Sequence, residues 1–233
     1  MLLEFNVYAN PMSQSYSQWG EEGIIEKIFE IINPSRFTCC EFGAADGLFC
    51  SNTAALWKAG WEAYLFESDE SKFKELKQNV KRQSGVYVDN ILVDDIDKLI
   101  EEPIQLMSID VDGLDLEIFR KIKTNHDVVV IEHNPTFPPW VYFEGGDKAG
   151  ASIRSIADEA TKKDYFFLTA TKSNTFLVSN RFKELFDEYN TNILDNFDYS
   201  CLNYIVTDYV GNYDIIGLLP YSMERKVDFE FST

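Results

Sequence analysis

The stretch CEFGAADGLFCSN, from Cys40 to Asn52, decides the fold. An apolar run ends in the acid Glu41, Gly43 and Gly47 bracket a tight turn, and the last two residues of the stretch can cap a following helix. Glycine lets the backbone turn with positive φ and approach a ligand closely. A strand, a glycine turn and a helix in this order are the layout of a nucleotide-type cofactor site.

A second acid follows at the spacing that such a site requires. WEAYLFE (61–67) reads as the next strand, and its final residue, Glu67, comes about 20 residues after Gly47. An acid at this strand end can accept hydrogen bonds from both ribose hydroxyls of an adenosine. The turn also carries Glu41 and Asp46, whose charges would repel a pyrophosphate and attract a sulfonium. These features favour S-adenosylmethionine over a dinucleotide.

Length and charge restrict the class of protein. The 233 residues suffice for one α/β domain, divided into an N-terminal helical segment (1–35), a cofactor-binding core (36–180) and a C-terminal extension (181–233). A net charge of −18 without a long single-sign run argues against binding to nucleic acid. No apolar stretch approaches about 20 residues, so no membrane segment is expected. We expect a cytoplasmic protein whose four cysteines are reduced.

Strand and helix patterns alternate along the core. Strands are expected at 36–42, 61–67, 86–88, 104–110 and 127–133, and helices at 20–32, 52–59, from Asp69 or Ser71 onward, at 114–122, 152–162 and 181–189. Solid apolar strands such as 127–133 are typical of a parallel sheet buried on both faces. YFFLTA (165–170) and NTFLVSN (174–180) are joined by only three residues, so they must form an antiparallel pair. The irregular, aromatic loop 137–151 is interpreted as a binding loop or lid.

Five motifs occur in order between residues 17 and 180: SQWGEEGI (17–24), EFGAADGLFCSN (41–52), FES (66–68), SIDVDGLDLEI (108–118) and VVVIEHNPTFPP (128–139). With them the chain resembles the FkbM-type S-adenosylmethionine-dependent methyltransferases, a branch of the class I, Rossmann-like methyltransferases. The resemblance implies a seven-stranded, mostly parallel sheet with an antiparallel hairpin strand and helices on both faces. It also implies methylation of a hydroxyl on a sugar, a sugar phosphate or a related small metabolite.

The cofactor site is expected at the ends of the first two strands, with a contribution from the fourth. Its predicted residues are Gln18, Glu41, Gly43, Ala44, Asp46, Gly47, Ser51, Asn52, Glu67, Ser68 and Asp110.

A second group of polar residues ends the fourth and fifth strands. Asp110 begins the turn DVDG, and Glu132 and His133 end the run DVVVIEH. Parallel neighbouring strands bring their carboxyl ends to one edge, so we expect these three residues to meet as the catalytic group. His133 would be the general base, or all three would hold a divalent cation. The alternative is that they only fix the loop that begins at Pro135.

Acceptor contacts are expected from the DVDG turn, the loop after the fifth strand and the next helix. The predicted residues are Asp112, Asn134, Trp140, Tyr142 and Arg154. Arg154, Lys148 and Lys172 are the cations expected nearest this edge, where they would meet an anionic acceptor such as a sugar phosphate. Their alternative role is solvated surface charge.

Other functions stay open on the sequence alone. Asp110 to Leu114, DVDGL, also resembles the nucleophile loop of haloacid-dehalogenase-like phosphatases. A non-catalytic module that binds the adenosine cofactor would keep the glycines and Glu67 without turnover. An assembly protein would use the aromatic residues of 181–233 at a partner interface, and the same extension is the expected surface for homo-oligomer formation.

Overall fold

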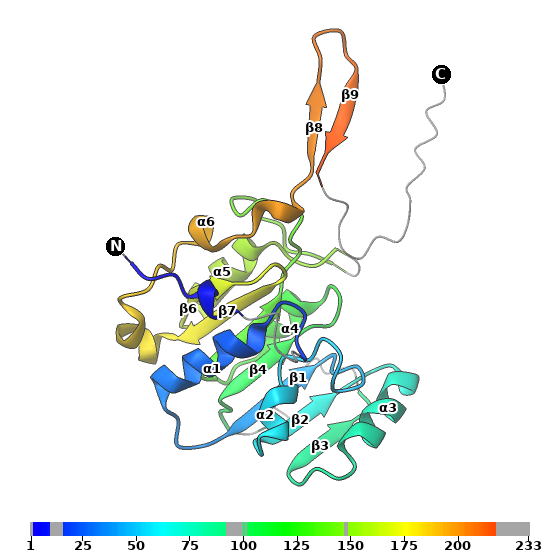
Figure 1. Cartoon of the computed structure of the whole chain (residues 1–233), viewed down its shortest axis with the longest axis vertical. Helices are drawn as coiled ribbons and strands as arrows, with labels where there is room; N and C mark the ends of the chain where they lie inside the picture. Colours follow the sequence, from blue (N-terminus) through cyan, green and yellow to red (C-terminus); the bar gives the residue numbers. More distant parts are fainter. Residues whose placement is uncertain (1, 10–15, 92–99, 101, 147–148, 218–233) are drawn as a thin grey trace.

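The computed structural model describes residues 2–9, 16–91, 100, 102–146 and 149–217. Its main sheet consists of β1 (Thr38–Phe42), β2 (Glu62–Phe66), β3 (Val86–Asp89), β4 (Leu106–Ile109), β5 (Val128–Glu132), β6 (Tyr165–Ala170) and β7 (Asn174–Ser179). The strand order is β3-β2-β1-β4-β5-β7-β6, and only β7 runs antiparallel to its neighbours (Figure 1). The expected seven-stranded, mostly parallel sheet with one antiparallel hairpin strand is confirmed.

Helices cover both faces of this sheet (Figure 1). They are α1 (Glu21–Ile32), α2 (Ala54–Lys58), α3 (Glu70–Val80), α4 (Asp115–Lys121), α5 (Ile153–Lys162) and α6 (Ile193–Asn196). The core is correspondingly double: α1, α2 and α3 pack on the face that includes Cys39, and α4 and α5 on the face that includes Cys40. Adjacent strand residues point to opposite faces, which separates these two thiols. All four cysteines are free, as the sequence predicts.

Helix boundaries follow the capping residues. The Asp69 carboxylate accepts hydrogen bonds from the backbone N–H groups of Ser71 and Lys72 and begins α3, and Ser152 caps α5 in the same way. The helix predicted at 181–189 is instead a 3₁₀ helix, η3 (Asn180–Phe186). Its only buried side chain is Phe186, so an α-helix there would gain little from tertiary packing.

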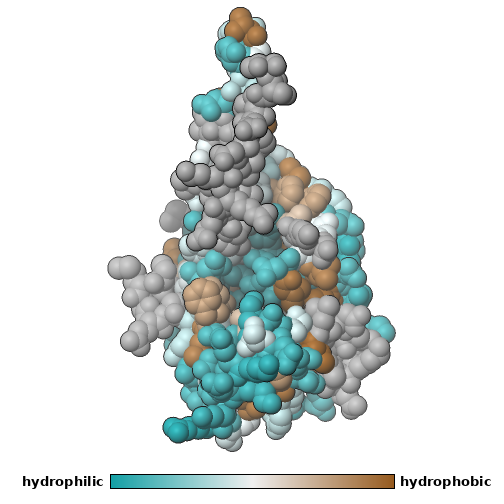
Figure 2. Space-filling model, turned by 90° about the vertical axis from the view of Figure 1, so that its right-hand side faces the viewer, coloured by the Kyte–Doolittle hydropathy of each residue, from teal (hydrophilic) through white to brown (hydrophobic). Residues whose placement is uncertain are grey.

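The C-terminal extension contains short elements and a hairpin. After η3 come α6 and the 3₁₀ helix η4 (Tyr199–Cys201), then β8 (Tyr204–Thr207) and β9 (Tyr213–Ile216) pair antiparallel. The hairpin projects from the body of the molecule, and its tip carries hydrophobic as well as hydrophilic surface (Figures 1 and 2). Within the described ranges, every helix is too short or too polar to cross a membrane.

Candidate functional site

A pocket of about 390 Å³ lies at the carboxyl ends of β1, β2, β4 and β5. Its lining consists of Gln18, Phe42, Gly43, Ala45, Phe49, Cys50, Phe66, Glu67, Ser68, Asp69, Lys72, Ile91, Asp110, Val111, Asp112 and Glu132. This is the edge at which open parallel sheets bind their ligands, and the volume is that of a small-molecule site.

The predicted site residues divide into two groups. The pocket is lined by Gln18, Gly43, Glu67, Ser68 and Asp110 from the predicted cofactor set, together with Asp112 and Glu132. The remaining predicted cofactor residues, Glu41, Ala44, Asp46, Gly47, Ser51 and Asn52, are not in the lining. For these residues direct contact with a cofactor stays a prediction, and the structure shows the contacts described below.

Glu41 organises the turn after β1 from behind. Its buried carboxylate accepts hydrogen bonds from Ser51 Oγ (2.6 Å), the Asn52 N–H (2.8 Å) and Thr53 Oγ1 (2.7 Å). Burial raises the pKa of Glu41, although these hydrogen bonds oppose the shift. The Asn52 side chain donates to Ser108 Oγ at 3.1 Å and so ties the turn to β4. These polar groups support the pocket wall through hydrogen bonds within the protein.

Asp46 and Gly47 are also committed to the turn. The Asp46 carboxylate accepts from the N–H groups of Leu48 (2.9 Å) and Phe49 (2.8 Å). Gly47 has φ +81°, and a Cβ added there would lie 2.6 Å from Leu76 Cδ1 in α3. The glycine is therefore required by chain direction and by close packing rather than by contact with a ligand.

Glu67 is a buried acid of the pocket whose carboxylate is held by two hydrogen bonds. Its two carboxylate oxygens accept from the N–H groups of Ala45 (2.8 Å) and Asp69 (2.7 Å), and the side chain is buried. Each carboxylate oxygen can accept more than one hydrogen bond, so both retain capacity toward the pocket. Glu67 thus joins the turn after β1 to the start of α3 and presents a fixed acceptor pair to a ligand.

Gln18 reaches the pocket because the segment before α1 is anchored on both sides. Glu22 accepts hydrogen bonds from the backbone of Ser17 (2.7 Å) and from Tyr16. The buried Glu21 carboxylate accepts from Thr171 Oγ1 (2.7 Å) in the β6–β7 turn. The two acids of SQWGEE therefore hold this segment across the carboxyl edge of the sheet.

Three carboxylates gather at the other end of the pocket. One carboxylate oxygen from each of Asp110, Asp112 and Glu132 lies within 4.8 Å of the other two. Burial, and then the charges of Glu132, Asp115 and Asp112, raise the pKa of Asp110 well above its usual range. Asp110 and Glu132 meet as the sequence predicts, and Asp112 completes the cluster.

The DVDG turn is shaped by a further acid. The buried Asp115 carboxylate accepts from the N–H groups of Val111 (2.7 Å) and Gly113 (2.9 Å). Burial raises the pKa of Asp115 to about 6. Asp112 adopts φ +58°, a left-handed conformation that aspartate tolerates better than most residues. Asp115 therefore holds Asp112 at the rim of the pocket.

The structure does not place His133 in this group, although the sequence predicts that it meets Asp110 and Glu132. Glu132 faces the pocket, and the next residue of an extended chain points to the opposite side. His133 is buried beside Phe197, and its Nδ1 lies 3.0 Å from Thr175 Oγ1. Burial lowers the pKa of His133 to about 3, so the ring is neutral. Its role is in the packing of β5 against β7.

The predicted acceptor residues beyond β5 are not in the pocket lining. Asn134 Oδ1 accepts from the Thr136 N–H at 2.9 Å, and its Nδ2 donates to the Ala149 carbonyl, so the residue fastens the loop. Trp140 and Tyr142 are 62% and 51% exposed. Closure of loop 137–151 over a substrate stays a prediction.

The predicted cations lie elsewhere. Arg154 pairs with Asp158 at 3.0 Å on α5 and lines a separate cavity. Lys172 lies 4.5 Å from the Trp19 ring centroid in another cavity, and Lys148 falls outside the described residues. The described cation that does line the pocket is Lys72, which the sequence reasoning missed.

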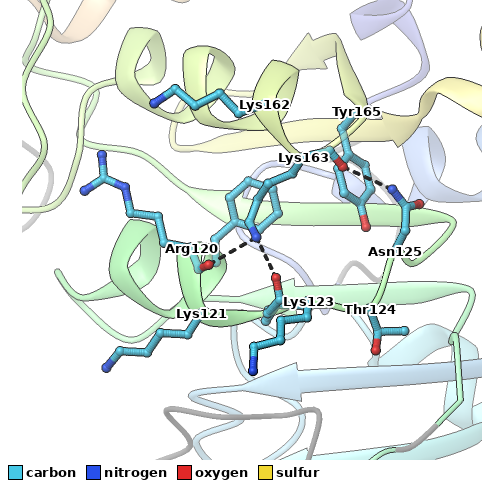
Figure 3. A pocket seen from close by; sticks show the side chains of 10 residues that line it. Arg120, Lys121, Lys123, Thr124, Asn125, Lys162, Lys163 and Tyr165 are labelled. Carbon is cyan, nitrogen blue, oxygen red and sulfur yellow. Dashed lines mark hydrogen bonds between the residues drawn. The ribbon is translucent and has the colours of Figure 1, made fainter.

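A larger cavity, about 690 Å³, lies at the ends of α4 and α5 and has a basic lining (Figure 3). Arg120 pairs there with Glu144 (2.7 Å) and Glu159 (3.3 Å), and Lys163 Nζ donates to the carbonyl of Arg120 at 3.1 Å. Cations at helix carboxyl ends stabilise the exposed carbonyls and the helix dipole. These contacts account for the basic residues, and no ligand role is assigned to the cavity.

Comparison with known proteins gives structural neighbours only. The chain matches no protein-family model and no curated protein sequence. The solved structures similar to it include S-adenosylmethionine-dependent methyltransferases. One is magnesium protoporphyrin IX methyltransferase from Synechocystis PCC 6803 with bound cofactor, at 10% identity over 68% of this chain and 79% of that one, TM-score 0.45. Others are a methyltransferase from Aquifex aeolicus (8% identity, 74% and 94%, TM-score 0.43) and a glycopeptide N-methyltransferase (8%, 70% and 90%, TM-score 0.45). Likenesses at this level identify neither a family nor a substrate.

Proposed function

We propose that this chain is an S-adenosylmethionine-dependent methyltransferase of the FkbM type that acts on a hydroxyl of a sugar, a sugar derivative or a related small metabolite. The observation that carries the proposal is the pocket at the carboxyl edge, with the fixed carboxylate of Glu67 on one side and the Asp110 cluster on the other. The Glu67 carboxylate can accept hydrogen bonds from the ribose of the cofactor. The carboxylates of the Asp110 cluster can face the methyl group and the acceptor. The chain is proposed to act as one domain.

In this proposal Glu67 accepts the ribose hydroxyls, and the backbone at Gly43 lies close to the cofactor. The positive sulfonium is attracted toward Asp110, which lines the same pocket. Gln18 closes the pocket from the segment before α1. These contacts would place the methyl group near the carboxylate cluster.

Methyl transfer itself requires no protein nucleophile. The acceptor oxygen attacks the methyl carbon, the carbon–sulfur bond breaks with its electron pair on sulfur, and the hydroxyl proton passes to a carboxylate. Asp110 and Glu132 are the proposed catalytic pair, because both line the pocket and their carboxylate oxygens lie close together. Alignment of the reactants supplies most of the remaining rate enhancement.

A divalent cation is a second candidate partner of the cluster. Three carboxylates within 4.8 Å are a donor set that fits a Mg²⁺- or Ca²⁺-type ion, with Asp110, Asp112 and Glu132 as ligands. Such an ion would lower the pKa of an acceptor hydroxyl. If activity is unchanged after thorough chelation, the cation has no part in the reaction.

The phosphatase alternative is not favoured. The nucleophile loop that DVDGL resembles carries a threonine-like residue after the glycine, whereas this chain has Leu114 there. A non-catalytic module for the same cofactor makes a different prediction, namely binding without turnover. Incubation with S-adenosylmethionine and pooled sugar-type acceptors, followed by mass spectrometry, distinguishes a methyltransferase from a binding module. The proposal expects the gain of one methyl group on an acceptor and the formation of S-adenosylhomocysteine. No product from any acceptor class would favour the binding module.

We further propose that the C-terminal extension mediates self-association. The hairpin of β8 and β9 exposes Ile205 (71%) and Val210 (83%), and an isolated two-stranded hairpin is only marginally stable in water. Sedimentation velocity of the wild type and of Ile205→Lys tests this: the proposal expects an oligomer that the substitution dissociates. A wild type that is monomeric at every concentration would contradict it.

A further inference from the structure

The side chain of Gln18 is held from outside the pocket by a buried serine. Gln18 lines the pocket, and its amide oxygen lies 3.4 Å from Ser173 Oγ in the link between β6 and β7. Trp19 Nε1 donates a hydrogen bond to the same Oγ at 3.1 Å. Ser173 is only 1% exposed, so its hydroxyl group depends on protein partners for its hydrogen bonds.

These two contacts fix which end of the Gln18 amide faces the pocket. An indole N–H can only donate, so Ser173 Oγ accepts from Trp19 and keeps one proton to donate. The Gln18 amide oxygen accepts that proton, and the amide nitrogen, Nε2, is then turned away from Ser173. Among the described residues, none accepts a hydrogen bond from Nε2. Its two N–H groups are therefore available to a ligand in the pocket.

Ser173 itself is fixed by the surrounding structure. Its backbone carbonyl accepts a hydrogen bond from the His133 N–H, at the end of β5, at 2.7 Å. On the other side, the buried Glu21 carboxylate accepts from Thr171 Oγ1 (2.7 Å) and Asn174 Nδ2 (3.0 Å). The link between β6 and β7 is thus joined both to β5 and to α1. The position of Ser173 Oγ is consequently set before any ligand binds.

The pocket that Gln18 faces is rich in acids. The carboxylates of its lining belong to Glu67, Asp69, Asp110, Asp112 and Glu132. The amino-acid tail of S-adenosylmethionine carries an ammonium group, which these acids attract, and a carboxylate, which they repel. The tail carboxylate therefore needs a hydrogen-bond donor in the pocket. The described cation of the lining, Lys72, belongs to α3, which begins shortly after the proposed ribose ligand Glu67.

We propose that Ser173 is a positioning residue: together with Trp19 it orients the Gln18 amide so that Nε2 binds the carboxylate of the cofactor's amino-acid tail. A hydrogen bond from an amide to a carboxylate is charge-assisted and stronger than one between neutral groups. The inference rests on the proposed function and adds to it a recognition element for the tail. Glu67 then recognises the ribose, and Gln18 distinguishes the whole cofactor from its adenosine fragments.

The test compares two ligands that differ in the tail. S-adenosylhomocysteine and 5′-methylthioadenosine share the adenosine and a neutral sulfur, and the second lacks the amino-acid tail. Both are titrated by calorimetry into the full chain. Gln18→Ala should weaken the binding of S-adenosylhomocysteine about tenfold and leave that of 5′-methylthioadenosine within about twofold. Ser173→Ala should change the same affinity ratio by about threefold, because the amide keeps its donors but loses its orientation.

Gln18→Glu separates recognition of the tail from a merely structural role. The new carboxylate still accepts from Ser173, but an oxygen with negative charge replaces the N–H donors. We expect S-adenosylhomocysteine to lose at least as much affinity as in Gln18→Ala, while 5′-methylthioadenosine binds nearly as before. The control is Ser179→Ala, at a buried serine at the other end of β7 and outside the pocket, which should keep both affinities.

Retained binding of 5′-methylthioadenosine reports that each variant is folded. An unchanged ratio in Gln18→Ala and Gln18→Glu, or parallel losses of both ligands, would overturn the inference. An unchanged ratio in Ser173→Ala would remove its positioning role. A ratio that responds to Lys72→Gln and not to Gln18→Ala would place the tail at α3 instead, which also contradicts the inference. If the wild type binds neither ligand, the proposed function itself is refuted.

Discussion

Gly43 lies directly against the backbone carbonyl of Asp110: a Cβ added at Gly43 would be 1.7 Å from that oxygen. Gly43 also has φ +75°, which side-chain-bearing residues rarely adopt. The contact joins the end of β1 to the end of β4, so the glycine turn and the carboxylate cluster form one structure.

The substitution Gly43→Ala should therefore damage both halves of the site. We expect a lower melting temperature and at least a tenfold loss of affinity for S-adenosylhomocysteine, because the Asp110 backbone cannot move without disturbing β4. Gly60→Ala is the matched control: Gly60 has φ +98° and nothing within 4 Å of the added carbon. It should lose stability through backbone strain alone and keep its affinity. Equal losses of affinity in the two variants would contradict the assignment.

Glu67→Gln should weaken cofactor binding by about ten- to a hundredfold, because the amide cannot accept hydrogen bonds at both of its terminal atoms. The control is Glu62→Gln at the other end of β2, where the carboxylate bonds to Tyr64 OH. Calorimetry with S-adenosylhomocysteine measures both. Wild-type affinity in Glu67→Gln would rule out a ribose contact.

His133 should affect stability and not catalysis. Its pKa of about 3 lies below the ordinary value of 6.5, so the unfolded chain binds a proton that the folded chain does not. Its contribution to stability is complete above pH 6.5 and is lost as the pH falls toward 3, by at most about 5 kcal/mol.

The substitution His133→Gln removes this dependence, so the difference in unfolding free energy between variant and wild type should change between pH 7 and 5. Glu41 and Asp115 titrate with the opposite sign, but equally in both proteins, and cancel in the difference. The methyl-transfer rate of the variant should stay within a few-fold of wild type. A loss of a thousandfold or more, with the fold intact, would restore His133 as a base.

Asp110→Asn should reduce the preference for S-adenosylmethionine over S-adenosylhomocysteine. The two differ by the positive charge on sulfur and by the methyl group, and Asp110 is the carboxyl of the lining that we propose to face the sulfonium. We expect the affinity for the charged form to fall about tenfold more than that for the neutral form. Equal changes for both ligands would place the sulfonium away from Asp110.

Much of the fold was predictable because its signals are local. The apolar run at 127–133, the short link between 170 and 174, and the Asp69 cap each fix one element from a few neighbouring residues. The 3₁₀ helix η3 and the hairpin after Cys201 were not predictable, because tertiary packing and exposure decide them.

The site was predictable at the level of strand ends but not of side-chain direction. Glu67 and Asp110 line the pocket as expected, whereas Glu41 turns to the backbone of the following residues. His133 follows Glu132 by one residue, so its side chain points to the opposite side of the sheet from the pocket. Lys72 was missed because one helix-start lysine has no sequence signal that separates it from surface charge.

The central claim is that the pocket between Glu67 and Asp110 holds S-adenosylmethionine. Calorimetric titration of the full chain with S-adenosylmethionine and with S-adenosylhomocysteine tests it most directly, with a rise in melting temperature as the parallel reading. The account predicts saturable binding of one molecule of each per chain. The absence of binding by both, with a folded protein, would contradict it.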